Sequence, residues 1–373
     1  MKFILAVVIT LAGVVPVASG QNAPTNAELR REAAAGSIDA QLKVGEMYRE
    51  GIGVIQNLRE AAKMYRLAAE QGSVDGQVQL GWMYYEGKGV AQDYAEAAKW
   101  FRLAAEQGSV DAQVQLGLMY SEGEGEGVVK NYAEAAKWFR LAAEQGDADA
   151  QVQLGARYYE GEGVAKNYAE AAKWFRLAAD QGNAYGQAGL GAMYYEGKGV
   201  AQDYAEAARW IRLAAEQGDA DAQVQLGARY YEGEGVAKNY AEAAKWFQLA
   251  AEQGNGLGKL LLGAAYAYGH GVPRVIDTAR LLWKQATESE DKEVSAAAFY
   301  NLGESYYAAQ EFGQRFPQWN DARNYWMRIK PADHEQAYKL ASAGLQCMSQ
   351  GKSSKQCAPL RCSIEGRSDC PDL

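Results

Sequence analysis

Apolar and polar residues along most of the chain follow the period of an α-helix, in short segments that end at glycine. In the segment VDAQVQLGLMYSEG, which covers residues 110–123, four residues fall on one face at helical spacing: Gln113, Leu116, Gly117 and Tyr120. A glycine inside a helix costs about 1 kcal/mol, so its place on this face predicts a neighbouring helix that packs closely against it. The segment ends at a glycine-rich loop, where the backbone needs residues without side chains.

A second helix follows each loop, opened by Asp or Asn with a Glu three residues later, which is the spacing of a capping box. The copy at 95–108, AEAAKWFRLAAEQG, predicts an apolar buried stripe on one side and a charged, solvated face on the other. The apolar stripe consists of Ala97, Trp100, Leu103 and Ala104. The charged face consists of Lys99, Arg102 and Glu106. Gly108 is expected to end the helix.

This pair of helices repeats along the chain. An apolar residue followed by Gly, with a Tyr three residues after the glycine, recurs at a spacing of 36 residues, except for one spacing of 38 and a last one of 40. A fixed period of this size is typical of a solenoid, so we predict an all-α solenoid of tandem helix-turn-helix repeats. The glycines are Gly45, Gly81, Gly117, Gly155, Gly191, Gly227, Gly263 and Gly303.

The unit LGWMYYEGKGVAQDYAEAAKWFRLAAEQG resembles the Sel-one-like repeat, a relative of the tetratricopeptide repeat. The resemblance implies a right-handed α/α superhelix and an adaptor that assembles protein complexes, often at membranes or in the bacterial envelope. We assign residues 21–37 to a capping helix, 38–287 to seven repeats and 288–345 to a degenerate eighth copy. One cysteine-rich secreted branch of the family is associated with β-lactams, but this chain lacks that branch's cysteine pair in each repeat.

Both ends of the chain indicate export. Residues 1–20 combine Lys2, an apolar run and the small residues Ala18 to Gly20, which predicts a cleaved signal peptide and a periplasmic or secreted protein. The run is shorter than a bilayer span. Residues 346–373 form a cysteine-rich tail, for which two disulfides of open pairing are favoured over a metal site. The tail cysteines are Cys347, Cys357, Cys362 and Cys370.

Charge and motifs narrow the function further. The net charge of −9 disfavours nucleic acid as a partner. The two histidines, His270 and His334, lie in different units of the stack, and no catalytic or phosphate-loop motif occurs, so we expect neither an enzyme nor a cofactor. An acidic loop holding Glu122, Glu124 and Glu126 is interpreted as solvated, with a weak cation site as the alternative.

Positions that vary between copies are the candidates for binding. Counted from the repeat glycine, positions +4 and +1 would face a concave groove, and position +2 would lie further round the exposed side. Tyrosines at +4 suit an extended peptide or a glycan, and the open alternative is that each packs between adjacent units. The candidate groove residues are Arg49, Trp82, Tyr85, Ser121, Tyr159, Tyr195 and Tyr231.

The leading hypothesis is therefore a non-catalytic adaptor of the envelope or secreted space that binds a peptide segment in its groove. The first alternative is a scaffold for cell-wall or exopolysaccharide machinery that binds glycan. The second is a weak hydrolase of β-lactams or peptidoglycan fragments. The five tryptophans at one position of the second helix are expected to pack in the core and not to stack on sugars.

Overall fold

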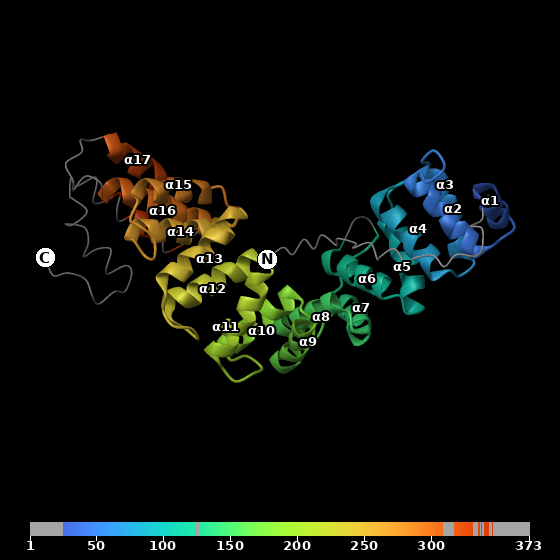
Figure 1. Ribbon diagram of the computed structural model, residues 1–373, viewed down its shortest axis with the longest axis horizontal. Coiled ribbons are helices and arrows are strands. Elements are labelled where there is room, and N and C mark those ends of the chain that lie inside the picture. Colours follow the sequence, from blue (N-terminus) through green and yellow to red (C-terminus); the bar gives the residue numbers. More distant parts are fainter. Residues whose placement is uncertain are drawn as a thin grey trace. The chain divides into compact units, whose positions relative to one another are not determined.

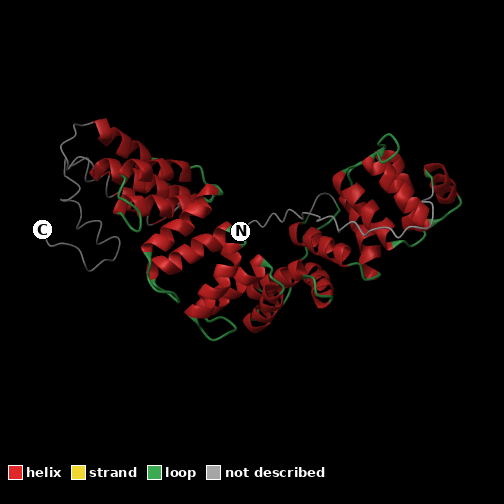
Figure 2. Ribbon diagram, in the orientation of Figure 1, coloured by secondary structure: helices red, strands yellow, loops and turns green. Residues whose placement is uncertain are grey.

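The computed structural model describes residues 25–123, 127–308 and 317–330, with several positions between 335 and 345. The predicted signal peptide and the four tail cysteines lie outside the described residues. The chain divides into two compact units, residues 1–130 with α1–α6 and residues 131–373 with α7–α17 (Figure 1). In the described ranges, Figure 2 shows helices and loops, and none of these helices has the length and apolarity to cross a membrane.

The helices come in pairs after a single leading helix, α1 (Asn26–Ala34). The first helices of the pairs are α2 (Ile38–Glu50), α4 (Val74–Glu86), α6 (Val110–Glu122), α8 (Ala148–Glu160), α10 (Ala184–Glu196), α12 (Ala220–Glu232), α14 (Gly256–Tyr268) and α16 (Lys292–Ala308). The second helices are α3 (Leu58–Glu70), α5 (Tyr94–Glu106), α7 (Tyr132–Glu144), α9 (Tyr168–Asp180), α11 (Tyr204–Glu216), α13 (Tyr240–Glu252), α15 (Ile276–Ala286) and α17 (Pro317–Trp326). Within each unit, consecutive helices pack on one another, which confirms the predicted all-α solenoid.

The helix ends follow the predicted cap residues. The Asp93 carboxylate accepts a hydrogen bond from the Glu96 backbone N–H (3.0 Å), and Gly87 ends the preceding helix in the left-handed conformation. The reciprocal half of the capping box is replaced here by a contact between helices. The Asp93 N–H donates to the Tyr84 carbonyl at 2.9 Å, and the Glu96 side chain pairs with Lys99 instead. The start of α5 is thereby tied to the last turn of α4, and Asn167, Asp203 and Asn239 make the same bond to Tyr158, Tyr194 and Tyr230.

The repeat glycines mark the closest approach of the two helices in a pair. A Cβ placed on Gly81 would lie 2.8 Å from the ring of Phe101, and one on Gly227 would lie 2.6 Å from the ring of Phe247. The predicted close packing at the glycine is confirmed. The eighth pair is built in the same way, because Gly303 lies against the indole of Trp326.

The buried stripe of the second helix differs from the prediction at one position. Leu103 is 39% exposed, and Phe101 is fully buried in its place. The reason is that the stripe must meet both the first helix of its own pair and the previous pair, so it widens to Ala97, Ala98 and Phe101 and leaves Leu103 outside. Three of the five tryptophans are buried as expected, among them Trp210 against Phe175 of the preceding pair, and Trp100 and Trp246 are partly buried.

Buried glutamines connect successive repeats. The Gln187 amide donates to the Ala179 carbonyl (3.4 Å), and its oxygen accepts from the Gln217 amide (2.8 Å). Gln223 does the same with Ala215 and Gln253. Because a buried amide with an unmet donor or acceptor costs about 1–3 kcal/mol, this pairing stabilises each junction and restrains its geometry.

Two glycines with positive φ differ in the space that a side chain would find. Gly199 has φ +71°, and a Cβ there would lie 2.1 Å from the Tyr168 carbonyl oxygen. Gly182 also has a positive φ, +86°, but a Cβ there would meet nothing within 4 Å. We expect Gly182→Ala to lower the free energy of unfolding by about 1 kcal/mol and Gly199→Ala by at least about 2 kcal/mol more, because the backbone must shift. Urea denaturation of both variants measures the difference, and equal losses would contradict the close contact.

Candidate functional site

The candidate site is a row of tyrosine pairs in the second unit, which we call the tyrosine row. Each pair joins the end of a first helix to the start of the following second helix, with partly exposed rings. The ring centroids of Tyr159 and Tyr168 lie 5.2 Å apart, in an edge-on arrangement. The row consists of Tyr159 and Tyr168, Tyr195 and Tyr204, and Tyr231 and Tyr240.

The first pair is held by the loop of the next repeat. Lys198 donates to the Tyr159 hydroxyl (2.8 Å), and that hydroxyl donates to the Glu196 carboxylate (2.6 Å). Burial and the hydrogen bond to Glu196 raise the pKa of Tyr159. Burial alone would raise the pKa of Glu196, but the hydrogen bonds from Tyr159 and Lys198 lower it overall. The result is a neutral phenol between a cation and an anion.

The other two pairs are covered by different groups. The Arg229 guanidinium lies over the Tyr195 ring, 3.7 Å from its centroid, and is paired with Glu234. His270 stacks on Tyr240 with centroids 4.7 Å apart and an angle of 13°, while its Nδ1 lies 2.9 Å from the Tyr231 hydroxyl. Each pair therefore contacts the repeat that follows it, and the row has both a structural role and exposed ring surface.

Two positions of the repeat change together. In four of the repeats, Met at position +2 occurs with Lys at +7, and Arg at +2 occurs with Glu at +7. The first repeat, with Met47 and Ile52, and the third, with Met119 and Glu124, do not follow this rule. In the Arg type the side chain at +2 reaches back to the preceding repeat, as Arg157 does to Tyr132 (5.0 Å). In the repeat with Met193, the loop residue Lys198 does so, over the rings of Tyr159 and Tyr168. The four pairs that follow the rule are Met83 and Lys88, Arg157 and Glu162, Met193 and Lys198, and Arg229 and Glu234.

The expectation that position +2 lies on the exposed side is wrong. Met193 is fully buried against Ala171, Ala172 and Phe175 of the preceding second helix. The Arg229 side chain is 12% exposed. Position +2 faces the previous repeat, so its side chain must fill that junction.

Comparison with known proteins supports the same architecture. The family profile described as "Sel1 repeat" matches residues 38–73, 74–109, 110–147, 148–183, 184–219, 220–255 and 258–291. The chain belongs to the Sel1 repeat family. No curated protein matches this sequence.

Two solved structures of Sel1 repeat proteins are similar to this chain. One is a protective antigen of uropathogenic Escherichia coli with an SLR fold, at 33% identity and a TM-score of 0.77, covering 92% of this chain and 71% of its own. The other is a Sel1 repeat protein from Oxalobacter formigenes, at 34% identity and a TM-score of 0.63, covering 72% of this chain and 77% of its own.

The groove residues predicted in the first unit have different surroundings. Arg49 pairs with Glu50 and donates to the Gln79 side chain of the next Sel1 repeat (2.5 Å). Trp82 packs edge-on against Tyr85, with centroids 5.5 Å apart. Ser121 is buried and donates to the Gly117 carbonyl (2.8 Å), so its assignment to an exposed groove is wrong. A hydroxyl three to four residues beyond a carbonyl can satisfy itself within the helix.

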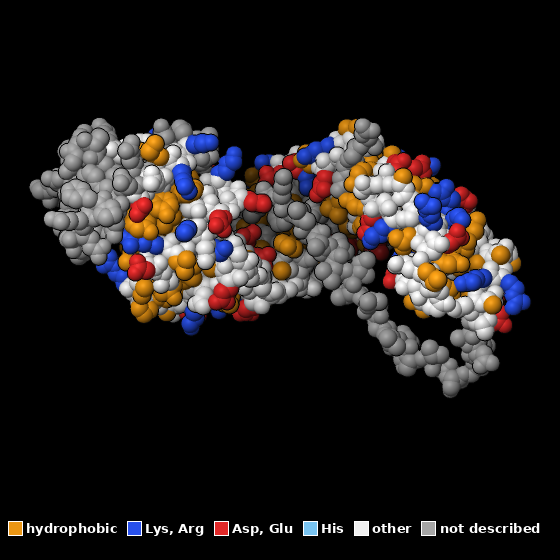
Figure 3. All heavy atoms as spheres, turned by 90° about the horizontal axis from the view of Figure 1, so that it is seen from above, with side chains coloured by type: hydrophobic (Ala, Val, Ile, Leu, Met, Phe, Trp, Pro, Cys, Tyr) orange, Lys and Arg blue, Asp and Glu red, His pale blue; other side chains and the backbone are white. Residues whose placement is uncertain are grey.

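Other functional residues were not predicted from the sequence. They are the second-helix tyrosines of the tyrosine row and the three groups that contact its rings, Lys198, Arg229 and His270. The signal that could have revealed them is the joint change of positions +2 and +7. The remaining surface charge is ordinary, because Figure 3 shows basic and acidic side chains interspersed on the visible face. Many form exposed pairs along one helix, such as Lys63 with Glu60.

The paired change predicts a thermodynamic coupling between Arg229 and Glu234. Arg229→Met leaves Glu234 without its cation, and Glu234→Lys places a second cation beside Arg229, so each single change should destabilise the chain. The double variant recreates the arrangement of Met193 and Lys198 and should recover about 1–2 kcal/mol relative to the sum of the two losses. Urea denaturation of the four proteins measures this coupling. Strictly additive losses would show that the two positions do not act together.

Proposed function

We propose that this protein is a non-catalytic scaffold of the cell envelope or secreted space that binds a peptide segment of a partner along the tyrosine row. The observation that carries the proposal is the repetition of partly exposed tyrosine pairs at one position in three successive repeats. Tyrosine offers a large apolar face and a polar tip at a low cost in conformational entropy, which suits peptide recognition.

The family supports the general part of this proposal, because Sel1 repeat solenoids are typical of protein-interaction scaffolds. The export part rests on the predicted signal peptide. It is compatible with the Escherichia coli relative, whose structure is described as that of a protective antigen.

The test uses positions beside the tyrosines. Each tyrosine also contacts the next repeat, so an alanine there would change stability and binding together. Ala192 and Ala228 stand at position +1, are partly exposed and precede Tyr195 and Tyr231 by three residues. A bulky charged side chain at these positions would obstruct the row.

We expect the double variant Ala192→Arg, Ala228→Arg to lose at least about tenfold in partner recovery, because the peptide can no longer lie on the rings. The measurement is affinity capture from the cells that make the protein, followed by quantitative mass spectrometry. The control is Leu177→Arg, Leu213→Arg, which adds the same charge on exposed positions of α9 and α11. Circular dichroism checks that both variants are folded.

Three outcomes would contradict the assignment. If partner recovery is unchanged with Ala192→Arg, Ala228→Arg, the tyrosine row is not the binding site. If recovery is lost only with the control variant, the binding site lies on the second helices. Calorimetric binding of purified peptidoglycan or polysaccharide fragments, abolished by the alanine-position variant, would favour the glycan scaffold over the peptide scaffold.

A further inference from the structure

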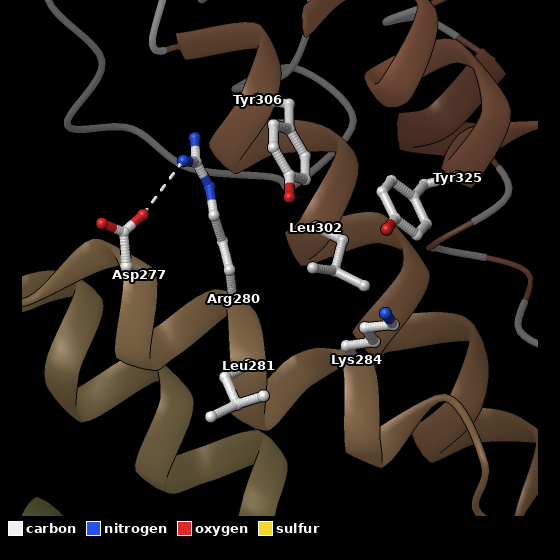
Figure 4. Close-up of a pocket in the computed structure, with 7 residues that line it drawn as sticks. All are labelled: Asp277, Arg280, Leu281, Lys284, Leu302, Tyr306 and Tyr325. Atoms are coloured by element: carbon white, nitrogen blue, oxygen red, sulfur yellow. Dashed lines mark hydrogen bonds and ion pairs between the residues drawn. The ribbon is translucent and has the colours of Figure 1, made fainter.

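The last two described helix pairs form an open hollow that the tyrosine row does not include. It has a volume of about 240 Å³ and lies between α15, α16 and α17 of the second unit. Figure 4 shows side chains from all three helices directed into it. Tyr306 and Tyr325 stand at one side with rings nearly parallel, 5.8 Å between centroids, and Leu302 forms the buried floor.

A departure from the repeat pattern creates this hollow. In five of the earlier second helices an arginine bonds the hydroxyl of the tyrosine at position +3 of the following first helix, as Arg212 does with Tyr230 (2.7 Å). Lys284 stands at the corresponding position of α15, and Tyr306 is the corresponding tyrosine. The pattern would therefore place Lys284 on Tyr306.

Arg280 takes that place instead. Every earlier second helix has a buried alanine at this position, the last of them Ala244. The Arg280 guanidinium lies 4.1 Å from the centroid of Tyr306, and it donates to the Ser305 carbonyl (2.7 Å) and hydroxyl (3.1 Å). Arg280 is thus fixed by Ser305 and the ring of Tyr306.

Lys284 is consequently released from the contact that its counterparts make. In the described part of the chain, no carboxylate forms an ion pair with its ammonium group. Asp277 lines the hollow, is 88% exposed and contacts Arg280 at 3.5 Å, and Asp321 of α17 lies close enough to Tyr306 to act on its pKa. Because Arg280 is already paired with Asp277, Lys284 is the cation at the hollow that can meet an acidic ligand.

The apolar part of the hollow lies beside these charges. Leu281 replaces the lysine of the preceding copy, Lys245, and is 58% exposed at the rim. Leu302 lies beneath. The ammonium group and the two phenols can donate hydrogen bonds, so an acceptor of negative charge with an apolar neighbour complements the site.

We propose that this hollow binds an acidic side chain of a partner peptide, with the carboxylate on Lys284 and the tyrosine hydroxyls and an adjacent aliphatic side chain on Leu281. The proposal rests on the peptide-scaffold function and adds the chemistry of the partner. It places a specificity-determining contact three repeats beyond the start of the tyrosine row.

The test uses the full chain and three fluorescein-labelled twelve-residue Gly-Ser peptides with amidated C-termini and central Leu-Glu, Leu-Gln or Leu-Lys. Fluorescence polarisation should show the Glu peptide binding about tenfold more tightly than the Gln peptide, as for a charge-assisted hydrogen bond. In Lys284→Glu the preference should reverse toward the Lys peptide. The control Lys245→Glu changes the net charge equally on exposed α13 and should keep the preference for Glu.

Equal affinity for the Glu and Gln peptides, or an equal effect of Lys245→Glu, would overturn the proposal. If Lys284→Glu leaves native partner recovery unchanged while Ala192→Arg, Ala228→Arg abolishes it, this proposal is wrong and the scaffold function stands. If neither variant affects recovery, the proposed function itself is wrong.

Discussion

Where the two helices of a pair lie in one compact unit, they meet at the repeat glycine, and a large side chain of the second helix fills the space that the glycine leaves. Phe101 lies against Gly81, Ile211 against Gly191, and an indole takes the same place at Gly263. Dispersion contacts of this kind are lost within a fraction of an ångström, so the pair has little freedom in distance or angle. The remaining contacts of the repeat depend on this spacing, because they join atoms of neighbouring helices.

Two polar systems reinforce the junction between repeats. On one side, buried glutamines such as Gln187 bond both the preceding helix and the glutamine that ends the next one. On the other, a cation from the next repeat lies on a tyrosine of the preceding one, as Arg229 does on Tyr195. The tyrosine row is therefore preorganised, which reduces the entropy lost when a ligand orders the site.

The last described repeats keep the same helix packing but have a different surface. The alanine that normally allows close packing becomes Arg280, which occupies the place of the usual cation and leaves Lys284 exposed. A substitution at a packing position thereby changes the surface one turn away. Repeat proteins can acquire distinct binding chemistry at one end in this way, without a change in the architecture that supports it.

The helix pairs, their caps and the closely packed glycines could be predicted from the sequence, because period, capping residues and glycine act over a few residues. The prediction was also correct for the buried tryptophans Trp138, Trp174 and Trp210, but it placed Leu103 on the wrong side, since the stripe is widened by a second neighbouring helix. The burial of Ser121, the direction of Met193 toward the preceding repeat and the packing of Arg280 on Tyr306 became visible only in the folded chain. These outcomes depend on which side chains fill the junctions between helices and between repeats. Sequence spacing within one repeat carries no information on that packing.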